Sequence, residues 1–300
     1  MPEFGLLTLH ALTSLHPGAG SSPGVVDLAI QREPHTRWPR IVGSSLKGVL
    51  RDRARGHAAK PSRTESNGDD DLVAVFGPVA EEASKHAGAL CVADARILAF
   101  PVRATKGTFA WLTSPGVFER LGRDLSLAGE ATAPLLPAVE EGRARCVTGS
   151  PLLQDGRIGL EEFEYDASPD NIVDKAGAWL AARVTDAEEA VKRLVVLNDE
   201  DFTHFVRRAT LLVARIAMES YETKHVQDRA LFYEEMLPPE TLMYAIVQAH
   251  PARNGKKTAT DVMQYLKTIL SEHDGVIQVG ADATVGVGWC RAQLAWSNAS

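Results

Sequence analysis

The chain has 300 residues and a mass of 32.4 kDa, with 45% hydrophobic and 24% charged residues, a balance that fits a folded globular protein and excludes disorder as the main state. It has no run of about eighteen apolar residues and no basic, cleavable N-terminal segment, so we expect a cytosolic protein without a membrane span. Its three cysteines, Cys91, Cys146 and Cys290, form no CxxC pair, which argues against a disulfide framework or a cysteine zinc site.

The net charge of −7 argues by itself against nucleic-acid binding, because binding to phosphates depends on Lys and Arg. The charge is uneven, however. Residues 31–63 carry nine basic and two acidic residues, a local charge of +7 that leaves −14 for the rest of the chain. This polarity favours one basic surface that faces a polyanion. A solvated, charged helix face is the alternative.

The N-terminal part of the chain predicts two strands around a loop. Residues 5–16 have the pattern of a strand, and the Gly- and Pro-rich residues 17–24 end it. Residues 25–30 then form a short apolar run that one acid, Asp27, interrupts. Asp27 is therefore expected at a junction between loop and strand.

The first helix is predicted from Ser44 onward, where apolar residues recur at helical spacing after an N-cap signal at residues 43–45. Lys47, Arg51 and Arg55 follow one another every four residues, so they lie along one stripe of this helix. The start of the helix also offers backbone amides that attract anions.

The rest of the chain mixes strands and helices without the regular alternation of a doubly wound sheet, which predicts one α+β unit. Residues 64–71 are expected in a polar surface loop, and residues 129–174 give weak signals that suit an insertion. The expected strands are residues 90–100, 108–113, 211–219, 230–236 and 242–247 and a closing pair within 276–296. The expected helices are residues 116–127, 199–209 and 260–270.

Several catalytic and cofactor motifs fail. Residues 20–24 read GSSPG and fit GxSxG, but a proline and a strand follow where a nucleophile elbow needs a helix. No segment ends like a Walker A loop, and GVG at 286–288 lacks a third glycine and a following helix. The histidines form no HExxH pattern. A serine hydrolase, a nucleotide cofactor and a zinc site are therefore not supported.

Three motifs lie close together near the N-terminus: LHPGAG at 15–20, GVVDLAIQRE at 24–33 and GSSLKGVLRD at 43–52. Shorter motifs follow along the chain: VFG at 75–77, GAL at 88–90, DAR at 94–96, FPVR at 100–103, KGTFAW at 106–111, ALFYEE at 230–235 and LPPETL at 237–242. This combination resembles the RAMP superfamily of CRISPR proteins, and within it the repeated backbone subunit of type III-B (Cmr) effector complexes. The resemblance covers nearly all of the chain except the middle and the acidic loop.

The resemblance implies a ferredoxin-like, RNA-recognition-type palm with insertions and a protruding β-hairpin thumb. We therefore expect a single RAMP-type domain over residues 1–300. Its palm would comprise approximately residues 1–198 and 239–300, with the weakly predicted insertion at 129–174, and its thumb approximately residues 199–238.

The resemblance also implies function and partners. Copies of the chain would stack in a helical filament along a CRISPR guide RNA, beside other type III-B subunits, and would cut complementary target RNA at regular intervals in antiviral defence. The chain would then be a guide-directed endoribonuclease that is active within the assembled complex. A non-catalytic guide-RNA scaffold is the main alternative, and a processing nuclease for CRISPR precursor transcripts fits the full-length pattern less well.

In this family an acid in the loop after the first strand is the key group for cutting, and the matching position is Asp27, while the loop histidine matches His16. RNA cleavage through the 2′-OH needs in-line geometry, proton transfer and neutralisation of phosphate charge. Asp27 would act as a base towards the 2′-OH or hold a divalent cation, Mg²⁺ or Mn²⁺. His16 would transfer a proton or position the loop. Without the family, Asp27 reads as a carboxylate that stabilises a turn.

Side chains suited to the sequence-independent binding of guide phosphates lie in the basic stretch and at the helix start: Arg32, Ser44, Ser45, Lys47 and Arg51. Gly286 and Gly288 would let the backbone approach RNA closely, or they form an ordinary hairpin turn. Four residues on or beside the thumb are candidates for a second catalytic contribution, although cross-strand and core roles suit them better: Glu219, Tyr221, Tyr233 and Glu234.

Overall fold

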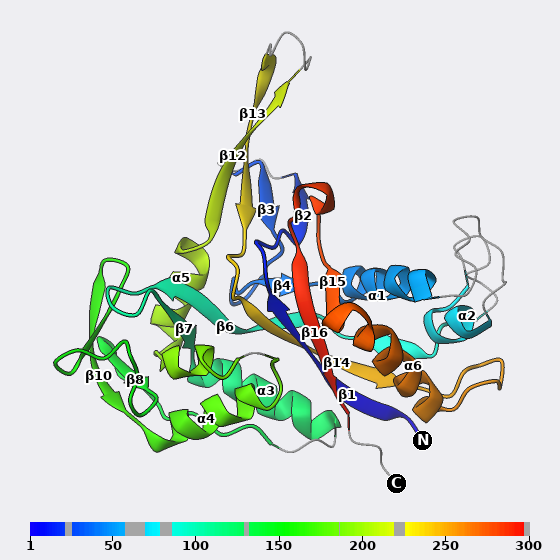
Figure 1. Cartoon of the computed structure of the whole chain (residues 1–300), viewed down its shortest axis with the longest axis horizontal. Coiled ribbons are helices and arrows are strands. Elements are labelled where there is room, and N and C mark those ends of the chain that lie inside the picture. Colours follow the sequence, from blue (N-terminus) through cyan, green and yellow to red (C-terminus); the bar gives the residue numbers. More distant parts are fainter. Residues whose placement is uncertain are drawn as a thin grey trace.

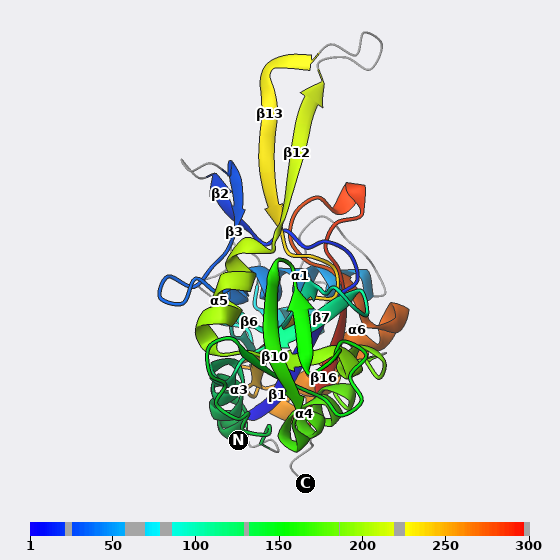
Figure 2. The ribbon, with the colours of Figure 1, turned by 90° about the vertical axis from the view of Figure 1, so that its left-hand side faces the viewer.

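The chain folds into a broad palm from which a long β-hairpin projects (Figures 1 and 2). A 12-stranded sheet runs through the palm, and a 4-stranded sheet joins the hairpin to it. The computed structural model describes residues 1–21, 26–57, 70–78, 86–128, 132–185, 187–218 and 226–296. The α+β class expected from the sequence is confirmed.

The palm sheet is built around β1 (Glu3–Ala11), which pairs antiparallel with β14 (Leu242–Ala249) and β16 (Trp289–Ala295). The last seven residues of β1 are all buried. Because successive side chains of a strand point to opposite faces, both faces of β1 are covered. Helices α3 (Pro115–Ala128) and α6 (Ala259–Ser271) both pack on it.

The palm sheet has the strand order β15-β16-β1-β14-β6-β7-β11-β8-β10-β9, with β4 beside β6 and β5 beside β14. Its other strands are β4 (Arg40–Ile41), β5 (Leu90–Val92), β6 (Ala95–Arg103), β7 (Phe109–Thr113), β8 (Arg143–Cys146), β9 (Arg157–Leu160), β10 (Phe163–Pro169), β11 (Leu194–Val196) and β15 (Val276–Gln278). The expected strand 90–100 is divided in two, because Ala93 and Asp94 belong to neither β5 nor β6 and the side chain of Asp94 bonds the start of α1.

The helices expected after residues 44, 116, 199 and 260 are confirmed. They are α1 (Gly43–His57), α3, α5 (Asp199–Arg208) and α6. The structure also contains α2 (Asp70–Phe76) and α4 (Asn171–Ala181), with short 3-10 helices η2 (Ala190–Arg193), η3 (Glu272–Gly275) and η4 (Ala283–Val285). Helix α6 shows the physical basis, since Thr258 and Asp261 form a capping box at its start and its apolar residues face the core.

One expectation for a loop needs correction, while the insertion at 129–174 stays a prediction. Asp70 and Asp71 were expected in the polar loop 64–71 but begin α2, whose apolar residues 74–76 are buried. The weakly read segment 129–174 contains β8, β9, β10 and the start of α4, so it is an ordered part of the palm where the structure describes it. Asp170 caps α4 by accepting a hydrogen bond from the N–H of Ile172.

The hairpin consists of β12 (Leu211–Met218) and β13 (Val226–Met236), and it joins the palm through β3 (Leu28–Ile30) and β2 (Gly18–Ser21). It stands well clear of the palm, with β2 and β3 beside its base (Figure 2). Helix α5 precedes it and buries Phe202 and Phe205 in the palm core. The predicted hairpin is therefore confirmed, while the domain limits at residues 199 and 238 stay a prediction.

None of the helices in the described ranges is long and apolar enough to cross a membrane. The three cysteines are free thiols, of which Cys91 is exposed and Cys146 and Cys290 are buried. Burial raises the pKa of Cys146 to about 11 and that of Cys290 to about 12. Both buried thiols therefore stay protonated near neutral pH and fill space in the core.

Candidate functional site

Asp27 is an exposed residue directly before β3, and its carboxylate is fixed by the hairpin. Strand β3 runs parallel to β13, with Leu28 opposite Glu234. At this contact Asp27 Oδ2 accepts a hydrogen bond of 2.8 Å from the backbone N–H of Tyr233. No described residue bonds Oδ1. Because the bond crosses to a strand 206 residues away in sequence, it does more than stabilise a local turn.

His16 lies between β1 and β2 and is buried, with 3% of the residue exposed. Its Nδ1 donates to the backbone carbonyl of Glu235 at 2.6 Å, since a carbonyl only accepts, and its Nε2 lies 3.5 Å from Glu234 Oε1. Gly18 leaves the room for this ring, because a Cβ at that position would lie 2.8 Å from Nε2. Both ring nitrogens face the hairpin, which favours the positioning role of His16 over direct proton transfer.

Four side chains join the hairpin to the palm, and we call them the hairpin-base cluster: His16, Arg215, Glu234 and Asp282. Glu234 is 2% exposed, and Arg215 Nε lies 2.5 Å from its Oε2. Arg215 Nη2 lies 2.7 Å from Asp282 Oδ2. The core role expected for Glu234 is thus confirmed, whereas Tyr233 is exposed, and Glu219 and Tyr221 lie outside the described residues.

Sequence reasoning missed Arg215 and Asp282, although each carries a signal. Arg215 is the one charged residue of β12, which reads LLVARIAM, and an arginine in an apolar strand calls for a buried partner. Asp282 stands four residues before Gly286 and adopts the left-handed conformation, with φ of 62°. Their partnership depends on the register of β12 and β13, which one sequence does not reveal.

Arg32 bonds groups of the protein itself, among them Glu235 on β13. Its Nη1 donates to the carbonyls of Arg37 and Val206, each at 2.9 Å, and its Nη2 donates to Glu235 Oε1 at 2.6 Å. Thr210 donates to the same carboxylate oxygen at 2.9 Å. A contact between Arg32 and RNA would therefore have to use its other N–H groups.

The start of α1 is held by an acid from a remote part of the chain. Asp94 Oδ1 accepts from the N–H of Gly43, and its Oδ2 accepts from Arg40, both at 2.8 Å. This carboxylate already occupies one of the amides that the sequence offered to an anion. Ser44 and Ser45 are exposed beside it, so their side chains face solvent at the helix start.

Lys47 and Arg51 are half-buried cations on α1. Burial lowers the pKa of both side chains; Arg51 lowers that of Lys47 further, and Arg55 lowers that of Arg51. Arg51 Nη1 donates to the carbonyl of Pro78, while its buried Nε has no partner, and no described carboxylate pairs with either residue. An anion at this stripe would compensate both cations, as the predicted guide phosphates would.

Gly286 and Gly288, both in the loop from Asp282 to Gly288, have different surroundings. Both have positive φ angles, 79° at Gly286 and 87° at Gly288. A Cβ on Gly288 would lie 2.1 Å from the carbonyl oxygen of Val279, so packing against the palm already demands glycine there. A Cβ on Gly286 would meet nothing within 4 Å, so open space lies beside this residue.

A metal site made by the protein alone is not found among the described residues, because no three or more His, Cys, Asp or Glu side chains are grouped for one. Asp27 contributes a single carboxylate. Mg²⁺ commonly takes one or two carboxylates and completes its shell with water and substrate phosphates, so this geometry fits a cation shared with RNA.

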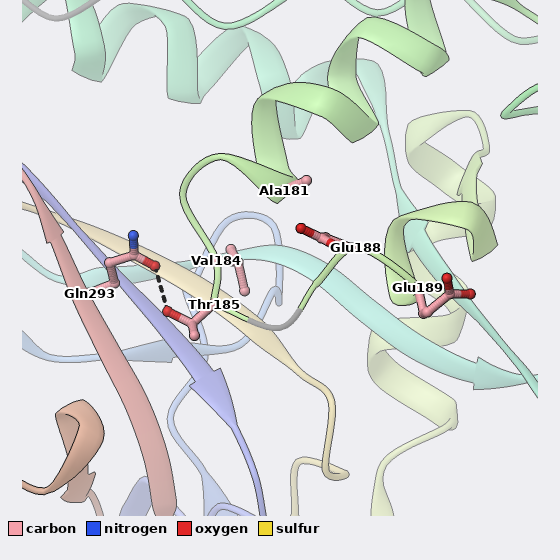
Figure 3. A pocket seen from close by; sticks show the side chains of 6 residues that line it. All are labelled: Ala181, Val184, Thr185, Glu188, Glu189 and Gln293. Atoms are coloured by element: carbon pink, nitrogen blue, oxygen red, sulfur yellow. Dashed lines mark hydrogen bonds between the residues drawn. The ribbon is translucent and has the colours of Figure 1, made fainter.

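A cavity of about 470 Å³ lies away from these residues, beside the end of α4 (Figure 3). Glu188, Glu189, Thr185 and Gln293 line it, and Thr185 bonds Gln293 at 3.0 Å. Helix α4 lies on the part of the palm opposite the hairpin (Figure 1). The carboxylates of Glu188 and Glu189 in the cavity repel phosphates, so this cavity is separate from the candidate RNA site.

The chain thus combines a mixed α/β palm, a projecting hairpin and an exposed acid at the base of that hairpin. A family model described as the RAMP superfamily matches residues 8–291, and the chain therefore belongs to the RAMP superfamily. It is similar to the CRISPR system Cmr endoribonuclease Cmr4 of Pyrococcus furiosus, with 35% identity over 96% of this chain and 95% of the relative. The resemblance stated from the sequence motifs is confirmed.

Solved structures agree with this assignment. The crystal structure of oligomeric Cmr4 from Pyrococcus furiosus has a TM-score of 0.73 and 29% identity, and the match covers 99% of each chain. A chain in the cryo-EM structure of the type III-B Cmr-beta complex bound to cognate target RNA has a TM-score of 0.75 and 20% identity, over 97% of this chain and 96% of that one. This second likeness shows the fold alone. The expected ferredoxin-like palm is consistent with both structures.

Proposed function

We propose that the chain is a guide-RNA-binding backbone subunit of a type III-B CRISPR effector complex, and that it cuts complementary target RNA at regular intervals. The supporting observation is Asp27, an exposed carboxylate that the hairpin holds through the N–H of Tyr233. Further copies of the chain, in a helical filament, and other subunits of the complex would be its partners. This role places the protein in the cytosol.

Asp27 would act on a target nucleotide displaced at the hairpin. Cleavage requires the 2′-OH to attack the adjacent phosphorus in line with the leaving 5′ oxygen. Tyr233 holds Oδ2, so Oδ1 is the oxygen available to accept the 2′-OH proton or to hold a cation. His16 would keep the loop and the hairpin together while this happens.

A divalent cation, Mg²⁺ or Mn²⁺, is the second route open to Asp27. Asp27 would hold this cation, which would supply positive charge to neutralise the charge that develops on the phosphate. The two routes differ in a measurable way, because chelation abolishes cutting only where the cation is required.

The guide would lie along the first part of α1. From here on, the helix stripe means Lys47 and Arg51 with the exposed Ser44 and Ser45, without Arg55. Lys47 and Arg51 supply cations with no described acid partner, and the serine side chains supply donors. Gly286 has open space beside its backbone, which RNA could approach. Gly288 packs against the palm and Arg32 bonds Glu235, so these two residues would contribute less to RNA binding. These contacts would go to phosphates and would accept any guide sequence.

The test is target-RNA cleavage by the complex reconstituted with guide RNA, in which Asp27→Asn is compared with the wild type in Mg²⁺ and in EDTA. We expect the variant to assemble and to lose about 10² to 10⁴ in cleavage rate, the contribution of a positioned base. Asp155→Asn is the matched control, because Asp155 is exposed before β9, outside the site.

Equal cutting by the wild type and Asp27→Asn, with an intact filament, would contradict this function and leave the scaffold alternative. Loss of cutting in EDTA by the wild type would assign the cation route to Asp27. Retention of cutting in EDTA would assign the base route.

A further inference from the structure

We propose that Arg215 is a positioning residue for RNA cleavage: it compensates the buried charge of Glu234 and thereby keeps Asp27 in place. Arg215 lies on β12, across β13 from Asp27, and it bonds Glu234 and Asp282 rather than Asp27 itself. The inference rests on the proposed function, because Asp27 is the group whose position matters.

The first step is the charge of Glu234. With 2% exposure its carboxylate is removed from water, and a buried carboxylate without a partner is strongly unfavourable. Arg215 Nε, at 2.5 Å, is its close partner, while His16 Nε2 stands off at 3.5 Å. Arg215 is therefore the main partner of the Glu234 carboxylate at the hairpin base.

Glu234 is connected to Asp27 through two neighbouring residues, Tyr233 and Leu28. Tyr233, whose N–H holds the Asp27 carboxylate, is the residue directly before Glu234. Leu28, which pairs with Glu234, is the residue directly after Asp27. A displacement of Glu234 thus moves both neighbours that fix Asp27. A shift of about 1 Å in a reacting group can cost about 100-fold in rate.

The third step is the second contact of Arg215. Its Nη2 bonds Asp282, and the preceding residue, Ala281, donates its N–H to the carbonyl of His16 at 3.1 Å. Arg215 therefore ties the hairpin to the glycine loop as well as to the loop that contains His16. Since Asp282 is about one-third exposed, this contact is the weaker of the two.

The competing interpretation is that Arg215 binds an RNA phosphate. Both of its contacts are carboxylates at 2.5 and 2.7 Å, so its charge is already compensated by protein. Lys47 and Arg51 differ, because they have no acid partner among the described residues. The contacts of Arg215 favour positioning over RNA binding.

The test compares Arg215→Met, Glu234→Gln and the double variant by single-turnover cleavage in the assembled complex. Arg215→Met is expected to lose about 100-fold, because Asp27 shifts. The double variant is expected to recover to within about 5-fold of the wild type, because removal of both partners leaves no unpaired buried charge. Guide-RNA affinity and its salt dependence are expected to stay unchanged in all three.

Two further variants keep the test informative if Arg215→Met fails to assemble. Arg215→Lys retains a cation for Glu234 and is expected to cut far better than Arg215→Met. Asp282→Asn removes only the weaker contact and is expected to lose about 2- to 5-fold. Arg157→Met serves as a control, since Arg157 is an exposed arginine between two acids on the insertion.

Hydrogen–deuterium exchange at the N–H of Tyr233 gives a readout independent of cutting. Faster exchange in Arg215→Met and recovery in the double variant would support the proposal even if the wild type proved unable to cut, which would overturn only the nuclease function. A double variant that assembles but stays as slow as Arg215→Met would overturn the positioning role. So would a weaker salt dependence of guide binding in Arg215→Met, since that would show a phosphate contact.

Discussion

The hairpin-base cluster pairs its buried charges with one another, whereas the helix stripe holds half-buried cations that no described carboxylate neutralises. Glu234 is enclosed by Arg215 and His16. Lys47 and Arg51 are instead partly buried without such a partner, and burial lowers the pKa of each side chain. The charges of the first region are paired within the chain, whereas the second region has room for an anion from outside it, which the proposed function identifies as guide phosphate.

This difference assigns different tasks to the two regions. A fully paired cluster is rigid, which suits a site that must hold Asp27 and a displaced nucleotide in line. Uncompensated cations on a helix gain most from phosphate, whatever the base sequence. The proposed function therefore assigns guide binding and cutting to different regions, and each task should be removable without the other.

The largest expected effect on stability is at the hairpin base. Arg215→Ala leaves the buried carboxylate of Glu234 without its close cation, and breaking a buried pair in this way costs about 3 to 5 kcal/mol. We expect a loss of this size in the free energy of unfolding, measured by denaturant titration.

Glu164→Ala is the control for this prediction, because the Glu164–Arg157 pair is more than half exposed and is worth at most about 1 kcal/mol. Equal losses in the two variants would mean that the hairpin-base cluster is no more tightly coupled than a surface pair.

The next effect is on guide binding. The double variant Lys47→Ala/Arg51→Ala is expected to weaken guide-RNA affinity by about 10-fold or more per cation, since a charged hydrogen bond contributes about 1.5 to 3 kcal/mol. The slope of log affinity against log salt should become shallower by about 0.7 for each lost phosphate contact on single-stranded RNA. Filter binding over a salt series measures both quantities.

Lys192→Ala/Arg157→Ala supplies the comparison, because both cations are exposed and already paired with acids. If this pair weakened guide binding as much as the helix-stripe pair, the effect would come from net charge and not from a site.

The smallest effect is the pH dependence of Lys47. Its pKa is lowered from the ordinary value of 10.5, so the unfolded chain binds its proton more tightly than the folded chain does. The charged form is therefore a cost to the free protein that disappears as pH rises through the lowered pKa. The stability difference between Lys47→Met and the wild type should move in favour of the wild type as pH rises towards 10.5. A constant difference would show that burial does not penalise this charge.

Much of the palm could be predicted from the sequence because its elements have clear periodicity. Helices α1, α3, α5 and α6 have apolar residues at helical spacing, and β12 and β13 flank a polar segment. Helix α4 was not predicted, although Asp170 and the buried Trp179 and Leu180 carry the same signals, because it begins in a segment rich in Gly, Pro and acids. β11 has only three residues, which is too short for periodicity.

The candidate site could be named only in part from the sequence, and its roles stay predictions. Asp27 and the helix stripe could be named because local motifs carry them. The partners that fix them lie far away in sequence: Asp94 is 51 residues from Gly43, and Asp282 is 67 residues from Arg215. Strand register and tertiary packing bring these groups together, and one sequence contains no direct signal of either.

The most direct test of the separation between cutting and guide binding is one experiment on assembled complexes. Guide-RNA affinity and the single-turnover rate of target cleavage are measured together for Asp27→Asn and for Lys47→Ala/Arg51→Ala. The account predicts that Asp27→Asn keeps guide affinity and loses cutting, while the double variant loses affinity and cuts at nearly the wild-type rate when guide is saturating. Loss of both properties in both variants would contradict it.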